Sequence, residues 1–327
     1  MNFAFPSVAV AIPTKNRPDD LDTTVASVLR QTILPKQLII IDQSGKEESR
    51  ERIIARYEAL HADLRKSVEL VYISDSSLTG ASAARNCALN DLKTEIVLFL
   101  DDDVILEHDF NERILEAYRD HPEAVGISGI ITNYPPLPAL FRYWTRLFTY
   151  GPFWDDRQPL YWRAARLRES APLKVTRLGG GLMSFATGAI GTTQFDENLH
   201  GACDGEDVDF CFKLRSVPLF IAPSARLVHK RSPGGRGREH WLSKHARTNW
   251  YLYQRNWNHG LRNRLCFVWL NVGYALATML VSIRRISFVP WTSLLRAIRE
   301  ANDLIGIKPD PGSNSEARLP KPQYPAR

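Results

Sequence analysis

Short apolar runs alternate with amphipathic stretches along the first 133 residues of the chain. Between the runs, hydrophobic positions recur with helical spacing over 21–30, 49–61 and 81–89. Strands that alternate with helices indicate an α/β domain with a mainly parallel sheet flanked by helices. Ligands bind at the carboxyl ends of the strands in such sheets, so the residues after each run are candidates for a site. The runs that predict buried strands are 7–12, 37–41, 68–73 and 95–100.

The pattern changes after residue 133. Residues 134–178 are rich in proline, arginine and aromatic residues and lose the alternation, which predicts an insertion with its own task. The run 219–229 predicts a late strand, and the composition of 232–238, SPGGRGR, predicts a mobile loop. After residue 307 the chain has the composition of a disordered tail. The expected organisation is a domain over 1–256, a helical region over 257–307 and a tail over 308–327.

Residues 265–283 form a run of 19 residues without a charge, close to the length of about 20 that a membrane-spanning helix needs. Arginines flank it on both sides, at Arg262 and Arg264 and at Arg284 and Arg285. A single span would leave one basic flank on the outer side of the membrane, against the positive-inside tendency. The run therefore predicts a helix at a membrane interface, with a buried core helix and a true span as the alternatives.

Charge is divided unevenly along the chain, although the net charge is only +6. Residues 212–327 hold 20 basic and 5 acidic side chains, whereas the rest of the chain holds 22 basic and 31 acidic ones. A strongly basic part predicts contact with a polyanion, either nucleic acid or an anionic membrane surface. Its aromatic residues accompany the uncharged run and form no evident base-stacking module, which favours the membrane and argues against nucleic acid.

Four cysteines are scattered without a CxxC pair, so neither a disulfide framework nor a structural zinc site is predicted. This usage is typical of a reducing compartment. The apolar N-terminus lacks the basic region of a signal peptide and is interpreted as the first strand. These features indicate a cytoplasmic protein, peripheral on the inner face of the cell membrane.

Three adjacent carboxylates, Asp101, Asp102 and Asp103, directly follow the apolar run 95–100. Carboxylates this close repel one another, which raises at least one pKa unless a cation is present. Their oxygens suit Mg²⁺ or Mn²⁺ shared with the phosphates of a substrate. A solvated acidic turn is the plain alternative, and the position after a buried strand favours the metal site.

A second acidic cluster, DGEDVD over 204–209, stands just before an apolar run. Carboxylates are favourable in the first turn of a helix, so capping alone explains one or two of them. Four acids in six residues exceed what a cap requires. One of them is therefore a candidate general base for a hydroxyl nucleophile.

These motifs, in this order, resemble the family 2 glycosyltransferases, inverting enzymes with the GT-A fold that use nucleotide-sugar donors. The resemblance covers roughly residues 8–256. It rests on IPTKNRP, IIIDQS, LTGASAARN and LFLDDD, and later on FDENL, GEDVDF, the strand ending in His229 and the helix ending YQRN. It implies a Rossmann-like domain with an aromatic and basic insertion and a C-terminal helical, membrane-associated region.

The family pattern implies a role for each matched residue. Asp207 is the expected base, and Glu206 supports the base or the acceptor. Asp101, Asp103 and His229 are the expected ligands of Mn²⁺ or Mg²⁺. The residues expected around the nucleotide-sugar are Pro13, Thr14, Arg17, Asp42, Asp75, Arg85, Asn86, Asp101 and Asp102.

The resemblance implies transfer of a sugar from a nucleotide-diphosphate sugar to a hydroxyl of a saccharide or lipid-linked acceptor, in cell-surface polysaccharide synthesis. One base and one metal suffice for a single inverting displacement. The loop 232–238 is expected to close over the donor, with Arg236 or Arg238 at the diphosphate.

Two other classes of protein are weighed against this function. A nucleotidyltransferase acting on sugar phosphates shares the metal aspartates, but it usually has a glycine-rich, basic phosphate loop that IPTKNRP lacks. A non-catalytic glycan- or membrane-binding protein is the other alternative. The filled acidic positions argue against it.

Overall fold

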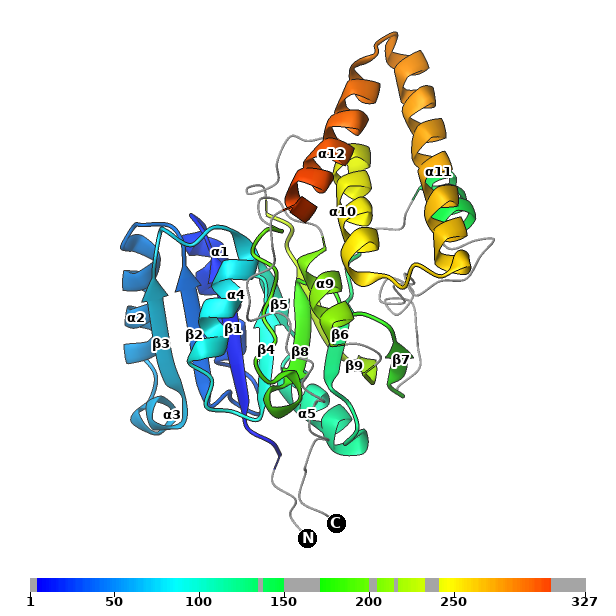
Figure 1. The fold of residues 1–327 in the computed structure, drawn as a ribbon. Coiled ribbons are helices and arrows are strands. Elements are labelled where there is room, and N and C mark those ends of the chain that lie inside the picture. The colour runs from blue at the N-terminus through cyan, green and yellow to red at the C-terminus, as the bar shows by residue number, and fades with distance from the viewer. Residues whose placement is uncertain are drawn as a thin grey trace. The chain divides into compact units, whose positions relative to one another are not determined.

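The computed structural model describes residues 5–134, 138–149, 171–199, 205–214, 217–232 and 241–306 (Figure 1). These residues form two compact units. The first unit contains the described residues up to Tyr134 and those between 171 and 232, and the second contains 138–149 and 241–306. The predicted loop 232–238, apart from Ser232, and the predicted tail 308–327 lie outside the described residues.

The described residues of the first unit build a nine-stranded sheet. Its first four strands in space, β3-β2-β1-β4, are parallel. Beyond β4 the sheet is mixed, because β8 runs antiparallel to both β4 and β6, and β5 and β7 run antiparallel to β9. The remaining pair, β6 and β9, is parallel. The strands across the sheet are β3 (Glu69–Ser74), β2 (Gln37–Asp42), β1 (Val8–Thr14), β4 (Ile96–Leu100), β8 (Leu182–Ala186), β6 (Gly126–Ile131), β9 (Leu219–His229) and β5 (Val104–Leu106), with β7 (Leu173–Val175) paired to β9.

The helices of the first unit follow from simple local signals. Helix α1 begins with Pro18 in its first turn and has Asp19 and Asp20 beside it, both favourable at a helix N-terminus. Right-handed crossovers place α4, which returns the chain to β4, on the face opposite α1 and α2. The helices are α1 (Pro18–Val28), α2 (Glu48–Glu58), α3 (Ala62–Ser67), α4 (Gly80–Asn90), α5 (Phe110–Asp120), α8 (Thr187–Ile190) and α9 (Glu206–Lys213).

The core of this unit contains the central strands, whose side chains are buried on both faces. That burial explains why β1, β2 and β4 have continuous apolar runs in the sequence. The predicted α/β fold is confirmed, and the four predicted N-terminal strands are β1 to β4. The sheet is mixed and not mainly parallel as predicted, because β8, β5 and β7 each pair antiparallel with their neighbours. The predicted late strand coincides with β9 (Leu219–His229).

The second unit is helical. It contains α6 (Ala139–Trp144), the π-helical turn η1 (Thr145–Thr149), α10 (Trp241–Asn256), α11 (Leu261–Arg285) and α12 (Val289–Gly306). Its core includes Leu242 and Ala246 of α10, Leu270 and Tyr274 of α11, and Leu294 of α12. Helix α10 lies within the range 1–256 that sequence analysis assigns to the first domain, but its apolar face packs on α12.

The predicted insertion over 134–178 contributes to both units. Residues 139–149 form α6 and η1 of the second unit, whereas Leu173–Val175 form β7 of the sheet. Residues 150–170 lie outside the described residues.

Candidate active site

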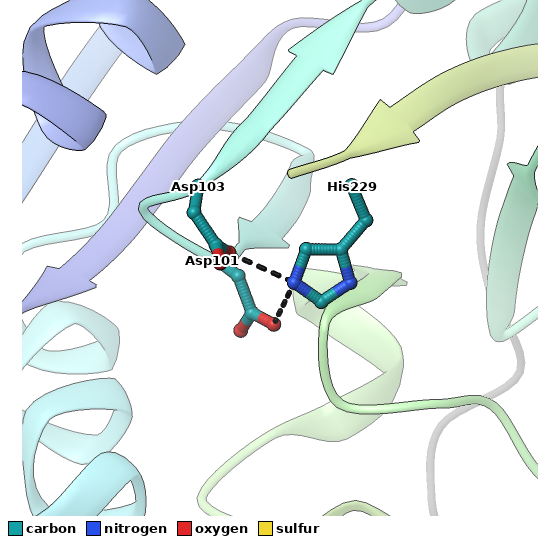
Figure 2. Close-up of side chains that lie close together, drawn as sticks. All are labelled: Asp101, Asp103 and His229. Carbon is teal, nitrogen blue, oxygen red and sulfur yellow. Dashed lines mark ion pairs between the residues drawn. The ribbon is translucent and has the colours of Figure 1, made fainter. Parts of the chain in front are cut away.

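Two chain segments converge beside β5. Strand β4 ends at Leu100, the three aspartates follow, and β5 begins at Val104. Strand β9 ends at His229, which is paired with Val104 across the antiparallel β5–β9 ladder. This register places the imidazole over the aspartates. Nε2 of His229 lies 2.8 Å from Oδ1 of Asp103 and 3.8 Å from Oδ2 of Asp101 (Figure 2).

Asp101, Asp103 and His229 form a set that suits a divalent metal ion. One ligand atom from each lies within 4.8 Å of the others. Burial raises the pKa of Asp101, although Arg85 and His229 oppose it. Burial also acts to raise the pKa of Asp103, but the hydrogen bond and charge of His229, the Ser232 N–H and the charge of Arg17 together outweigh it and lower that pKa. Two carboxylates and one imidazole offer oxygen and nitrogen ligands, a set that suits Mn²⁺.

Asp102 points away from this set. Its Oδ2 accepts a hydrogen bond from Thr14 Oγ1 at 2.7 Å, and its Oδ1 accepts one from Arg17 at 2.9 Å. Burial raises the pKa of Asp102 to about 6, although Thr14 and Arg17 act against the shift. The middle aspartate therefore ties the end of β1 to the metal set.

Arg85 lies inside the protein, although sequence analysis places it beside the nucleotide or diphosphate. Only 3% of the residue is exposed. Its guanidinium donates to Glu206 Oε1 at 2.8 Å and to the carbonyl oxygen of Gly180 at 2.8 Å, and it lies 3.9 Å from Asp101 Oδ1. Burial lowers the pKa of Arg85, but Glu206 and Asp101 outweigh it and keep the group charged. Arg85 thus connects the metal set with the second acidic cluster.

That cluster forms the first turn of α9, which begins at Glu206 after Gly205 in a left-handed conformation. Asp207 accepts hydrogen bonds from the backbone N–H of Gly180 at 2.6 Å and from that of Val208 at 2.8 Å. Burial first, and then the charge of Glu206, raise the pKa of Asp207 to about 7. A carboxylate with this pKa can accept a proton near neutral pH. Of the other two acids of the cluster, Asp209 is buried and lies 2.9 Å from Lys213, and Asp204 lies outside the described residues.

Four of the predicted nucleotide residues lie at the carboxyl ends of β1, β2 and β3: Pro13, Thr14, Asp42 and Asp75. Pro13 is paired with Ile41, and Thr14 with Asp42. The backbone N–H of Asp75 donates to the carbonyl oxygen of Asp42 at 2.9 Å.

The two predicted nucleotide carboxylates differ in exposure. Asp42 is buried and accepts hydrogen bonds from the Ser44 N–H at 2.8 Å and the Tyr72 hydroxyl at 2.7 Å. Asp75 is more open, and its Oδ1 accepts bonds from the Ser77 N–H and hydroxyl at 2.8 and 2.6 Å.

Asn86 is the predicted nucleotide residue that the structure does not bring to this edge. Its amide donates to the carbonyl oxygen of Phe195 at 3.0 Å and to Glu197 at 2.8 Å, and it accepts from the N–H of Phe195 at 2.8 Å. The side chain is buried. Asn86 therefore fixes the segment after α8 against α4.

Sequence analysis misses three residues beside the site. Gly181 lies so close to the metal set that a Cβ there would come within 2.6 Å of Asp101 Oδ2. The Arg231 guanidinium lies 4.4 Å from the ring centre of Tyr134. Burial raises the pKa of Tyr134, Arg231 opposes the shift, and the charges of Asp101 and Asp207 add to it, so the phenol lies near both acidic groups. Of the three, only Gly181 leaves a trace in the sequence, as the last residue of the run Gly179-Gly180-Gly181.

Similarity to known proteins agrees with this arrangement. The family model "Glycosyl transferase family 2" matches residues 9–171. A protein named as a teichuronic acid biosynthesis glycosyltransferase, TuaG of Bacillus subtilis, is 32% identical over 124 residues, which cover 38% of this chain and 46% of TuaG. The chain thus aligns with less than half the length of that relative. The succinoglycan biosynthesis protein ExoM of Rhizobium meliloti is 24% identical over 243 residues, covering 72% of this chain and 71% of ExoM.

Two solved structures have a similar fold. Residues 1–349 of S. aureus TarS in complex with UDP align with a TM-score of 0.56 and 14% identity, covering 92% of this chain and 81% of TarS 1–349. The mannosyltransferase PcManGT from Pyrobaculum calidifontis, in complex with GDP-Man and Mn²⁺, aligns with a TM-score of 0.54 and 15% identity, covering 92% and 87% of the two chains. With the family match and the ordered acidic motifs, these likenesses lead to one assignment: the chain belongs to glycosyltransferase family 2 and has the GT-A fold.

Proposed function

We propose that the protein transfers a sugar, with inversion, from a nucleotide-diphosphate sugar to a hydroxyl of a saccharide or lipid-linked acceptor. The observation that carries the proposal is the convergence of Asp101, Asp103 and His229, joined through Arg85 to the Glu206–Asp207 pair. Arg85 thus lies between a candidate cation site and a carboxyl whose pKa is near 7. A single inverting displacement requires both groups.

In this mechanism, Asp101, Asp103 and His229 would hold Mn²⁺ or Mg²⁺, which would supply positive charge to offset that of the departing diphosphate. The Asp207 carboxylate takes the proton from the acceptor hydroxyl as that oxygen attacks the anomeric carbon. The N–H groups of Gly180 and Val208 orient the carboxylate. The negative charge of Glu206, which Arg85 holds in place, raises the pKa of Asp207, so its proton-accepting carboxylate form predominates only above about pH 7.

The donor's nucleotide is proposed to bind along the ends of β1, β2 and β3, at Pro13, Thr14, Arg17, Asp42 and Asp75. Thr14 and Arg17 support this placement because both are hydrogen-bonded to Asp102, which stands in the sequence between the two proposed metal ligands. Arg85 and Asn86 are proposed as positioning residues, since their side chains are buried and bonded to the protein.

The named relatives give the wider setting. TuaG and ExoM are named for teichuronic acid and succinoglycan biosynthesis, so we place this protein in cell-surface polysaccharide synthesis. UDP and GDP-Man in the two similar structures favour a nucleoside diphosphate donor. The basic back third favours a peripheral position on the inner face of the cell membrane, where anionic lipids attract basic segments.

The test is a donor-binding and turnover assay with Mn²⁺ across UDP-, GDP- and dTDP-sugars. The wild-type protein should bind one class of donor and release the nucleoside diphosphate. Asp103→Ala should lose metal-dependent binding and turnover, whereas Asp63→Ala, on exposed α3, should change neither. Release of pyrophosphate from sugar phosphate and nucleoside triphosphate would indicate a nucleotidyltransferase instead. Donor binding without any turnover, with every acceptor class tried, would contradict the catalytic assignment.

A further inference from the structure

We infer that one face of α11, with the turn that follows it, lies in the headgroup region of an anionic membrane. This inference rests on the peripheral location proposed above and identifies the surface responsible. The apolar stripe consists of eight side chains on α11 that are 40–74% exposed and recur every three or four residues: Leu261, Leu265, Val268, Val272, Leu276, Met279, Leu280 and Ile283. Residues with that spacing share one side of a helix.

The other side of α11 packs against the rest of the helical unit, and this packing fixes the rotation of the helix about its axis. Leu270, Tyr274 and Thr278 are buried on that side. Gly273 meets η1 so closely that a Cβ there would lie 2.5 Å from the ring of Phe148. Trp144 also donates to the Gly273 carbonyl oxygen at 3.3 Å. The helix is therefore held in one rotation, with the stripe turned outward, and the alternative of a fully buried core helix fails.

The turn between α11 and α12 extends the same apolar surface. Ile286 is 95% exposed, and Phe288 and Val289 are also exposed. Ile286 has φ 49°, a conformation that is strained for a β-branched residue and is usually given to glycine. Its N–H caps α11 by bonding to the carbonyl oxygen of Ile283. An exposed isoleucine in such a turn is costly in water and favourable when the side chain enters an apolar phase.

The charges around the stripe decide between occupants. Exposed arginines lie at both ends of α11 and on α12: Arg262, Arg264, Arg284, Arg285, Arg296 and Arg299. In residues 241–306 the sequence contains only two acids, Glu300 and Asp303, and Glu300 is paired with Arg247 at 2.9 Å. A second copy docked on the stripe, parallel or antiparallel, would bring arginine ends together. An anionic lipid surface complements both the apolar stripe and its basic ends.

The neighbours of α11 favour an orientation parallel to the membrane plane. With 25 residues the helix is about 37 Å long, and it is both long enough and apolar enough to span a bilayer. A span would also carry α12 and α10, which pack with it, into the hydrocarbon. These helices bear Arg299, Glu300 and Lys244, whose burial in lipid is expensive. A helix lying in the interface keeps every one of these charges in water.

Sedimentation of the full-length protein with vesicles tests the inference. Vesicles of equal parts phosphatidylcholine and phosphatidylglycerol should bind the protein, and phosphatidylcholine alone should bind it at least tenfold more weakly. The double variant Leu280→Asn/Ile283→Asn should weaken binding to anionic vesicles at least tenfold at any salt concentration. Arg284→Gln/Arg285→Gln should weaken it roughly 30-fold at low salt and little at high salt. All substituted side chains are exposed, so the fold should persist, as circular dichroism and thermal unfolding would verify.

Matched controls are Leu64→Asn and Arg65→Gln on exposed α3, which should bind vesicles like the wild type. Donor binding in Mn²⁺ should be the same in the stripe variants as in the wild type. If the wild-type protein itself binds no donor, that result counts against the proposed activity and not against this surface. Three results would overturn the inference. They are vesicle binding that survives the stripe variants, extraction by detergent but not by alkaline carbonate, and dimerisation abolished by the stripe variants in the absence of lipid.

Discussion

Asp207 is a buried carboxyl with a pKa raised to about 7, so its charge state changes within the physiological range. A general base works only when deprotonated, and the rate should therefore fall as the pH drops through about 7. Asp207→Asn should lower turnover by roughly 10²- to 10⁴-fold and leave donor affinity nearly unchanged. A pH profile of kcat/KM and calorimetric titration of the donor measure the two effects. A larger loss in Glu206→Gln at unchanged donor affinity would reassign the base.

The same carboxyl makes a separate prediction about stability. Its pKa is 3.8 when unperturbed, so between about pH 4 and 7 the folded protein holds a proton that the unfolded chain releases. The contribution of Asp207 to the free energy of unfolding should therefore fall as the pH rises across this window. Asp207→Asn should flatten that dependence in urea unfolding. A slope unchanged by the substitution would indicate that Asp207 titrates normally.

Arg85 is the residue whose removal should harm the fold most. Arg85→Leu leaves the Glu206 carboxylate buried without its cation, a change that typically costs about 3–5 kcal/mol in free energy of unfolding. Arg85→Lys keeps the charge but cannot donate to Glu206 and Gly180 with the same fixed geometry, so turnover should fall more than stability. Denaturant unfolding and kcat report these effects. Arg50→Leu, at an exposed ion pair with Glu47, should cost less than about 1 kcal/mol.

The sequence predicts which residues gather at the site better than it predicts where each side chain points. Asp101, Asp103 and His229 were grouped by motif order, and the structure brings them together. The direction of Asp102 depends on Thr14 and Arg17, which lie about 85 residues away in sequence. The burial of Arg85 similarly depends on Glu206, more than 100 residues later. A local sequence pattern does not reveal contacts between residues so far apart in the chain.

At the scale of elements, the turn before β8 supports the metal set. The carbonyl oxygen of Gly181 accepts from the N–H of Asp101 at 3.3 Å, and its missing side chain leaves room for the Asp101 carboxylate. Gly181→Ala should displace that carboxylate from His229 and weaken Mn²⁺-dependent donor binding at least tenfold, with little change in unfolding free energy. Calorimetric titration measures the affinity. Gly188→Ala in α8, where a Cβ meets nothing within 4 Å, is the matched control and should bind as the wild type.

The predicted strands correspond to β1 to β4 and β9, whereas β5 to β8 were not predicted. Strands β1, β2 and β4 are buried on both faces and therefore appear as apolar runs. Strands β5 and β7 have three residues each, too few for a periodicity. The sequence also does not reveal that α10 belongs to the helical unit, because its apolar face packs on α12, which begins more than 30 residues later.

For the whole molecule, metal binding should appear as added stability. An ion that binds only the folded state at about 100 times its Kd adds about 2.7 kcal/mol, or roughly 5–10 °C in Tm for a domain of this size. Mn²⁺ should raise Tm in this range, a chelator should reverse the shift, and Asp103→Ala should abolish it. Differential scanning calorimetry measures all three. An equal shift in wild type and Asp103→Ala would mean that the ion binds elsewhere.

The pairing of β5 with β9 limits which mutations this protein can accept near the site. Val104 is paired with His229 and Leu106 with Leu227, so a slip of one residue would turn the imidazole to the opposite face of the sheet. Ile105, between them, is partly exposed and open to many substitutions. An inserted or deleted residue between Asp103 and Leu106 would shift this register, separating the histidine from the carboxylates and turning a buried side chain of β5 out of the core. This segment therefore tolerates substitution at Ile105 but no change in length.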